Sequence, residues 1–185
     1  MNKDLFLKDL SRKLSEIDDA LNKFSREDEE ALQQHPAEGN WSALECIEHL
    51  HRYNAFYLPE FQKSIHKAPL SSSDEMKRGR FGMKTAKSML PGEKGVNNPM
   101  KTFKSKNSLN SNLSKAILDQ FREEQAELRS IIDSASMRDI GAVKCKTTLP
   151  LIRFRLGDAL EFIINHQVRH VAQAQRALDT VLSFQ

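Results

Sequence analysis

Two histidines four positions apart, His166 and His170, are the residues whose type and spacing best suit chemistry. On a helix, residues four apart lie one above the other, so both imidazoles would face the same point. Apolar residues at helical spacing share that face and predict that it is buried; the stripe comprises Ile163, His166, His170, Ala174, Ala177 and Val181. Imidazole nitrogens in a core need partners away from water, and a divalent metal ion would provide one.

A metal held by two histidines of one helix needs a third ligand from elsewhere, and the candidates are His49 and His51. Helical periodicity does not choose between them, because each shares a face with other buried-type residues. His35 and His66 lie beside a proline and near a loop, so we expect both at the surface. The residues also leave open that the histidines bind no metal and satisfy one another through hydrogen bonds.

Four amphipathic patterns predict the helices that position these histidines, and together they indicate an all-α four-helix bundle. The first is a stripe of Leu10, Leu14, Ile17, Leu21 and Phe24, and the others cover residues 42–66, 112–134 and 158–182. A short segment, 149–156, is the one place where apolar residues alternate as in a strand.

Capping signals place the starts of the second and fourth helices. Ser42 followed by Glu45 fits a capping box, and Trp41 stands where a hydrophobic staple would pack. Asp158 with Glu161 is a second pattern of this kind, so we expect the fourth helix to begin at Asp158.

One long basic connection, residues 67–111, separates the second and third helices, and we expect it to be largely a loop. Within it, the stretch 76–106 has nine Lys or Arg and one acid, Glu93, so it carries +8 while the other residues sum to −5. Such a loop could bind an anion or remain solvated. It has only two aromatic residues to stack on bases, so we expect no nucleic-acid partner.

Length and composition indicate one soluble domain over residues 1–185, with 39% hydrophobic and 29% charged residues. No apolar stretch approaches the roughly 18 residues of a membrane span, and the first residues lack the apolar core of a signal peptide. Cys46 and Cys145 stand far apart without a CxxC partner, so we expect buried thiols. These features predict a cytoplasmic protein without a membrane partner.

Three segments carry a family resemblance. Residues 41–50 read WSALECIEHL and resemble the W-S-x-x-E-x-x-x-H-L signature of the DinB-like (YfiT-like) metalloenzyme superfamily. Residues 166–173 read HQVRHVAQ and resemble its H-x-x-R-H-x-x-Q signature. Residues 99–103, PMKTF, are similar to a P-x-K-T-F segment common before the third helix.

The resemblance implies an up-down-down-up four-helix bundle and one divalent metal ion, with Zn or Ni expected. It selects His49 over His51, so that the implied ligands are His49, His166 and His170. It also leaves open a supporting role for Glu45 behind His49, although helix capping explains that residue equally well.

The other residues that match the family signatures have simpler interpretations. Arg169 and Gln173 could be a surface charge and a helix-packing amide. Asn165, next to a ligand, is expected to take no part.

Family members include metal-dependent thiol transferases that use a small bacterial thiol, a mycothiol-dependent isomerase, and many dimers. The resemblance therefore implies a homodimer acting on a small molecule, with a low-molecular-weight thiol as one possibility. Three histidines leave a coordination position open, which suits a metal-dependent thiol S-transferase or hydrolase. The alternative is a non-catalytic, metal-binding or stress-related bundle. If the basic connection folds over the site, Lys101 and Lys104 are the residues expected to meet an anionic substrate group.

Overall fold

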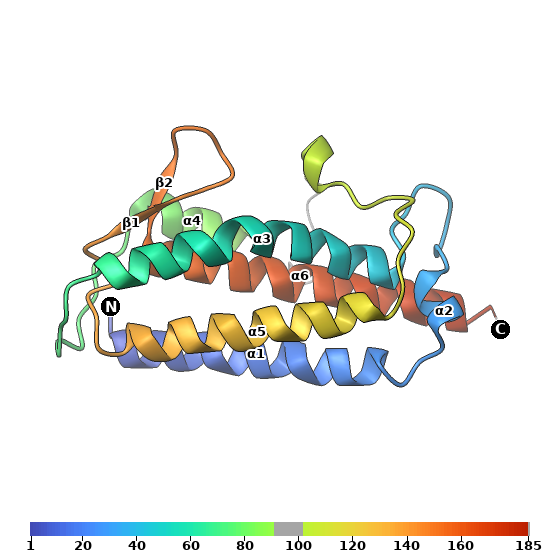
Figure 1. The fold of residues 1–185 in the computed structure, drawn as a ribbon, viewed down its shortest axis with the longest axis horizontal. Helices are drawn as coiled ribbons and strands as arrows, with labels where there is room; N and C mark the ends of the chain where they lie inside the picture. Colours follow the sequence, from blue (N-terminus) through green and yellow to red (C-terminus); the bar gives the residue numbers. More distant parts are fainter. Residues whose placement is uncertain (91–101, 185) are drawn as a thin grey trace.

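The computed structural model describes residues 1–90 and 102–184, and in them four long helices lie side by side (Figure 1). They are α1 (Lys3–Phe24), α3 (Ala43–Lys67), α5 (Ala116–Ala135) and α6 (Leu156–Leu182). The first and last run in one direction and the middle two in the other, which confirms the predicted up-down-down-up bundle (Figure 1). Both α3 and α1 pack against α5 and α6.

The predicted apolar stripes form the core of the bundle. The stripe of α1 is almost completely inaccessible to solvent, and the predicted stripe of α5 is also buried: Ile117, Phe121, Leu128 and Ile131. Helix α5 begins at Ala116, four residues later than expected, and Leu113 packs against the core from the preceding segment. Truncating one of these buried leucines to alanine typically costs about 2–5 kcal/mol, so the core specifies the bundle strongly.

The capping box at the start of α3 is present as predicted. The Ser42 hydroxyl accepts a hydrogen bond from the Glu45 amide, and the Glu45 carboxylate accepts one from the Ser42 amide. The helix then continues through Pro59 to Lys67, which carries His49 into the middle of the bundle.

The capping box expected at Asp158 is wrong. Helix α6 begins two residues earlier, at Leu156, and Asp158 is fully buried inside its first turn. Its carboxylate accepts hydrogen bonds from the Gly79 amide (2.7 Å) and the Arg78 guanidinium, which also pairs with Glu161. The two acids therefore bind the basic connection, because a buried Arg78 requires carboxylate partners.

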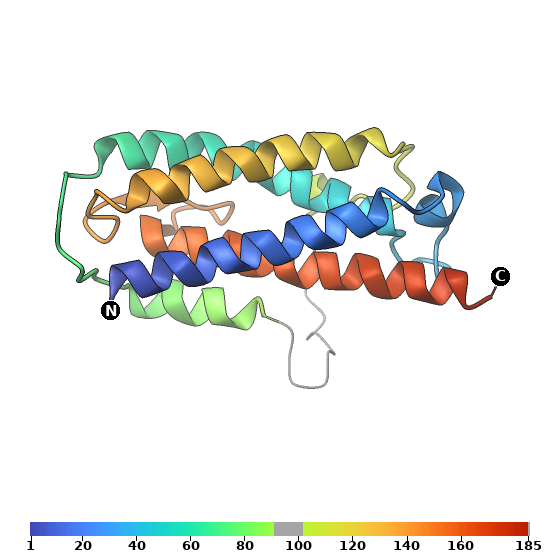
Figure 2. The same cartoon turned by 90° about the horizontal axis from the view of Figure 1, so that it is seen from below.

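The long connection is more structured than its composition indicates. It contains the helix α4 (Arg80–Ser88) and a 3-10 turn, η1 (Lys104–Lys106). Figure 2 shows α4 lying along α6, and Gly82 permits this approach, since a Cβ there would stand 2.8 Å from the Cβ of Asp158. The connection thus covers one side of α6.

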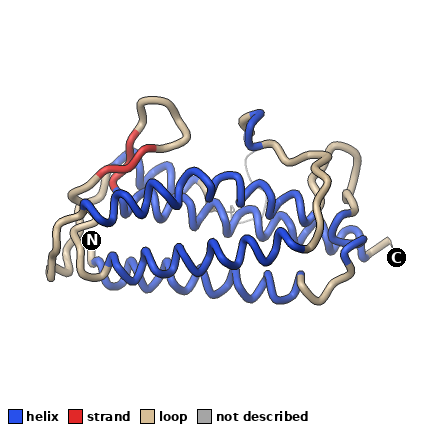
Figure 3. The backbone as a smooth tube through the Cα atoms, viewed as in Figure 1, coloured by secondary structure: helices blue, strands red, loops and turns tan. Residues whose placement is uncertain are grey.

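Small elements complete the fold (Figure 3). Strands β1 (Lys144–Lys146) and β2 (Arg153–Arg155) pair antiparallel before α6, and the alternating segment 149–156 anticipated only the second of them. The loop of this hairpin rests on α3, where the Thr148 amide donates to the Tyr57 hydroxyl (3.2 Å). A short helix, α2 (Glu29–Gln33), follows α1.

Both cysteines are buried and unpaired, as predicted, and burial raises the pKa of the Cys145 thiol to about 12. Among the described residues, no helix combines the length and the apolar character that crossing a membrane requires.

Candidate metal centre

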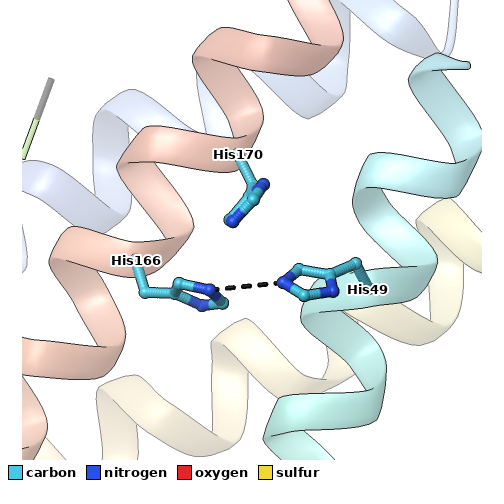
Figure 4. A group of neighbouring side chains, drawn as sticks. All are labelled: His49, His166 and His170. Carbon is cyan, nitrogen blue, oxygen red and sulfur yellow. Dashed lines mark hydrogen bonds between the residues drawn. The ribbon is translucent and has the colours of Figure 1, made fainter. Parts of the chain in front are cut away.

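Three histidines from two helices meet between α3 and α6, and Figure 4 shows their rings pointing toward one another. They are His49 of α3 with His166 and His170 of α6, and one nitrogen from each lies within 4.8 Å of the others. The Nε2 atoms of His49 and His166 are 3.3 Å apart. The structure thus brings together the three residues named from the sequence.

The positions of the three histidines on α6 and α3 explain why their rings lie close together. His166 and His170 stand one turn apart on α6, and their ring centroids are 4.5 Å apart. His49 comes from the neighbouring antiparallel helix, with its centroid 4.4 Å from that of His170 and 5.1 Å from that of His166. The alternative ligand His51 is turned toward α5, where its Nδ1 donates to Glu124 (2.5 Å).

Hydrogen bonds fix the tautomers of two of the three rings. A carbonyl oxygen can only accept, so the Nδ1 of His49 donates to the Lys106 carbonyl (2.7 Å). In the same way, the Nδ1 of His170 donates to the Oε1 atom of Gln173 (3.0 Å). In both rings the Nε2 atom therefore keeps its lone pair, which is the arrangement of metal-binding histidines.

His166 is the most enclosed member of the group. Its Nδ1 is buried and has no hydrogen-bond partner among the described residues, and its Nε2 faces His49. This imidazole therefore depends on the cluster for its polar contacts.

All three histidines are held neutral. Burial lowers the pKa of His49 to about 4 and that of His170 to about 3, and it holds the pKa of His166 far below its usual value. The positive charges of Lys106 and Arg52 lower the pKa of His49 further. Neutral imidazole is the form that coordinates a metal, so the group is ready to bind at neutral pH.

The separation of the nitrogens fits a metal ion. Two nitrogens that each lie about 2.05 Å from a zinc ion at the tetrahedral angle are about 3.35 Å apart. The observed distance between the Nε2 atoms of His49 and His166 is 3.3 Å. A set that spans at most 4.8 Å needs only small side-chain adjustments to surround one ion.

Two aromatic rings wall the centre, and the sequence did not indicate either role. Trp41 lies 4.7 Å from His49 and 5.8 Å from His170 between ring centroids, and its indole donates to Asn107 (3.2 Å). Tyr53, one turn beyond His49 on α3, lies 5.0 Å from His49 and 4.6 Å from His166. A tryptophan just before a helix cap predicts a staple, and only the tertiary structure places it against the histidines.

The other residues considered beside the three histidines have different roles in the structure. Gln173 supports His170, whereas the Glu45 carboxylate caps α3 and accepts from the imidazole of His35 (3.0 Å) rather than from His49. Arg169 is buried rather than a surface charge, and Asn165 bonds to the Ala86 carbonyl (2.9 Å) away from the centre.

Two predicted residues, Pro99 and Lys101, lie outside the described residues, as does most of the PMKTF segment. Thr102 and Phe103 of that segment are exposed and directly precede η1. The segment therefore leads into the turn whose last carbonyl, that of Lys106, accepts from His49.

Comparison with known proteins identifies one family. Residues 10–174 match the DinB superfamily, a range that includes all three histidines, the basic connection and Gln173. No significant match to a curated protein or to a solved structure was found.

Proposed function

The chain belongs to the DinB superfamily, and we propose that it binds one divalent metal ion through His49, His166 and His170 and acts on a small molecule there. The observation that carries this proposal is the convergence of three neutral imidazoles, two of them oriented by a hydrogen bond at Nδ1. Zn or Ni is the expected ion, because both bind imidazole well.

The residues around the centre favour an open site. In the part of the chain that the structure describes, no carboxylate or thiol joins the three histidines, and His170 is partly exposed. A structural metal site is normally closed by a fourth protein ligand. The arrangement therefore supports a site where an exchangeable ligand completes the coordination.

A metal ion bound there would act as a Lewis acid, which lowers the pKa of a coordinated water or thiol. The chain's own residues orient the ligand imidazoles through the Lys106 carbonyl and Gln173, and shield one side with Trp41 and Tyr53. We favour a thiol S-transferase with a low-molecular-weight thiol over a hydrolase, as the family resemblance suggests.

A non-catalytic role is the second candidate. The contact between His49 and His166 is also compatible with an N–H···N hydrogen bond in a metal-free core. That bond would use two imidazoles and leave the Nε2 of His170 without a role, whereas a metal ion accounts for all three.

The proposal extends to the organisation of the protein in the cell: one domain, present in the cytoplasm as a homodimer. Size-exclusion chromatography with light scattering would measure the oligomeric state, and a monomer at micromolar concentration would contradict the dimer.

Elemental analysis of protein purified without a histidine tag tests the metal. We expect about one equivalent of Zn or Ni in the wild type, loss in His49→Ala and His170→Ala, and retention in His51→Ala, which removes the other candidate ligand of α3. Circular dichroism would verify that each variant is folded. Protein that contains no metal and takes up neither Zn nor Ni would overturn the proposed function.

A further inference from the structure

Lys106 is the residue by which the basic connection reaches the metal centre, and we propose that its ammonium recognises an anionic group on the substrate. This inference rests on the proposed function and adds a substrate class to it: a small thiol that carries a second, negatively charged group.

The backbone of Lys106 anchors it beside a ligand. Its carbonyl accepts the Nδ1–H of His49 at 2.7 Å, so the position of the residue is tied to that imidazole. Ser108, two residues later, is fully buried and donates from its hydroxyl to the Glu45 carbonyl (2.7 Å), which fixes the segment to α3 a second time.

The side chain of Lys106 stays on the same face of α3. Its Nζ lies 5.4 Å from the ring centroid of Tyr53, and it donates a hydrogen bond to the Arg52 carbonyl. The Tyr53 ring in turn contacts His49 and His166. The ammonium is thus packed on a ring that borders the cluster, and the side chain is only half buried.

No acidic side chain of the described residues compensates the charge of Lys106 by an ion pair. The neighbouring Arg52 is paired with Glu48 (2.6 Å between Nε and Oε1), but Lys106 forms no ion pair with any residue in 1–90 or 102–184. An ammonium has three donors, and one is used by the Arg52 carbonyl, so two remain for a ligand.

The wider field around the centre has the same sign. The Arg52 guanidinium lies beside Lys106, where it donates to the carbonyl of the next residue, Asn107. With a divalent cation bound, such a site attracts anions and disfavours cations.

The structure also changes which lysine of the connection is expected to bind the anionic group of the substrate. Lys104 stands two positions earlier in the same 3-10 turn, but it is exposed, and no hydrogen bond or ion pair joins its ammonium to a described residue. Lys104 therefore provides a matched control with the same charge in the same turn.

Two small thiols separate charge recognition from thiol binding. We would load the protein with Co²⁺ and titrate it with 2-mercaptoethanesulfonate and with the neutral 2-mercaptoethanol, following the absorption band of the cobalt–thiolate bond. On binding, each thiol loses its proton to the buffer. The ratio of the two dissociation constants within one variant cancels any general effect of a substitution on the centre.

We expect the wild type to bind the sulfonate at least about fivefold more tightly, equivalent to about 1 kcal/mol. Lys106→Gln should bring the ratio close to one, and Lys104→Gln should leave it as in the wild type. Added salt should reduce the wild-type ratio, because the sulfonate is recognised at a half-exposed site. Cobalt content and circular dichroism would show that both variants keep the centre.

The outcomes are distinguishable. A ratio that is the same in the wild type and Lys106→Gln, with both thiols bound, would overturn this inference and leave the proposed function intact. No cobalt uptake, or no thiolate band with either thiol, would overturn the proposed thiol chemistry and this inference with it.

Discussion

His49 and Lys106 are 57 positions apart in the chain, yet the imidazole Nδ1 of the first donates to the backbone carbonyl of the second at 2.7 Å. The bond links the proposed metal ligand of α3 to the last part of the connection between α3 and α5. It sets the tautomer of His49 through a main-chain atom, so no side-chain substitution at Lys106 removes it. The position of the segment 104–108 therefore controls the orientation of the His49 imidazole.

The anchor of this segment gives the first prediction. Ser108→Ala removes the hydrogen bond from the buried hydroxyl to the Glu45 carbonyl, and should cost about 1 kcal/mol of unfolding free energy. Because the Lys106 carbonyl would then be held less firmly, we also expect Zn²⁺ affinity to fall severalfold. Competition with a chromophoric chelator would measure it. Ser105→Ala, exposed in η1, is the control, and equal affinity in both variants would contradict the prediction.

Gln173 gives a second test of ligand orientation. Gln173→Leu removes the acceptor for His170 Nδ1, so metal affinity should fall about 10- to 100-fold, as is usual for supporting residues of histidine ligands. Gln173→Glu keeps an acceptor and should retain most of the affinity. The matched control is Gln175→Leu, because Gln175 bonds to Asp179 away from the centre. Unchanged affinity in Gln173→Leu would show that this hydrogen bond does not orient His170.

Local patterns in the sequence were sufficient for the bundle and for the histidine pair. The period of 3.6 residues marks the buried stripe of α1, and the spacing of His166 and His170 places them on one face whatever the rest of the chain does. The capping box at Ser42 is equally local, since its bonds join residues three apart.

Such local patterns do not predict contacts between segments that are far apart in the sequence. Asp158 is of a residue type that often caps helices, but its carboxylate binds Arg78, eighty positions earlier. No local pattern distinguishes an aspartate that caps a helix from one that binds a distant arginine. Likewise, periodicity could not choose between His49 and His51, and only the family resemblance selected the correct partner of α6. The contacts of Trp41 and Lys106 with the histidines could not be predicted either, because they depend on how segments distant in the sequence pack together.

The histidines predict a pH dependence of the metal-free protein. Their folded-state pKa values, about 4 for His49 and about 3 for His170, lie below the value near 6.5 expected in the unfolded chain. Between those values only the unfolded state takes up the protons. The contribution of the neutral histidines to the unfolding free energy is therefore fully present above about pH 6.5. It falls as the pH drops, by about 1.4 kcal/mol per pH unit for each such group.

Urea unfolding of the metal-free protein at pH 7.5, 6.0 and 5.0 would measure this effect. Carboxylates add their own dependence, so the informative quantity is the difference between the wild type and His170→Leu. We expect the variant to lose less stability on acidification than the wild type. Parallel profiles for the two proteins would show that His170 does not remain neutral in the fold.

Arg78 gives the last prediction, which concerns how the basic connection is held on the bundle. Its side chain, 9% exposed, pairs with Asp158 and Glu161 of α6 and lies 4.7 Å from the ring centroid of Phe6. Arg78→Met would leave two carboxylates at the start of α6 without their cation, and such a loss typically costs about 3–5 kcal/mol. Urea unfolding would measure it, with Arg80→Met as the control, because Arg80 is exposed and should change stability by less than about 0.5 kcal/mol. The same substitution should also expose the connection to limited proteolysis, because α4 would be held on α6 by fewer contacts. If both variants unfolded at the same urea concentration, the ion pairs of Arg78 would not be what holds the connection on α6.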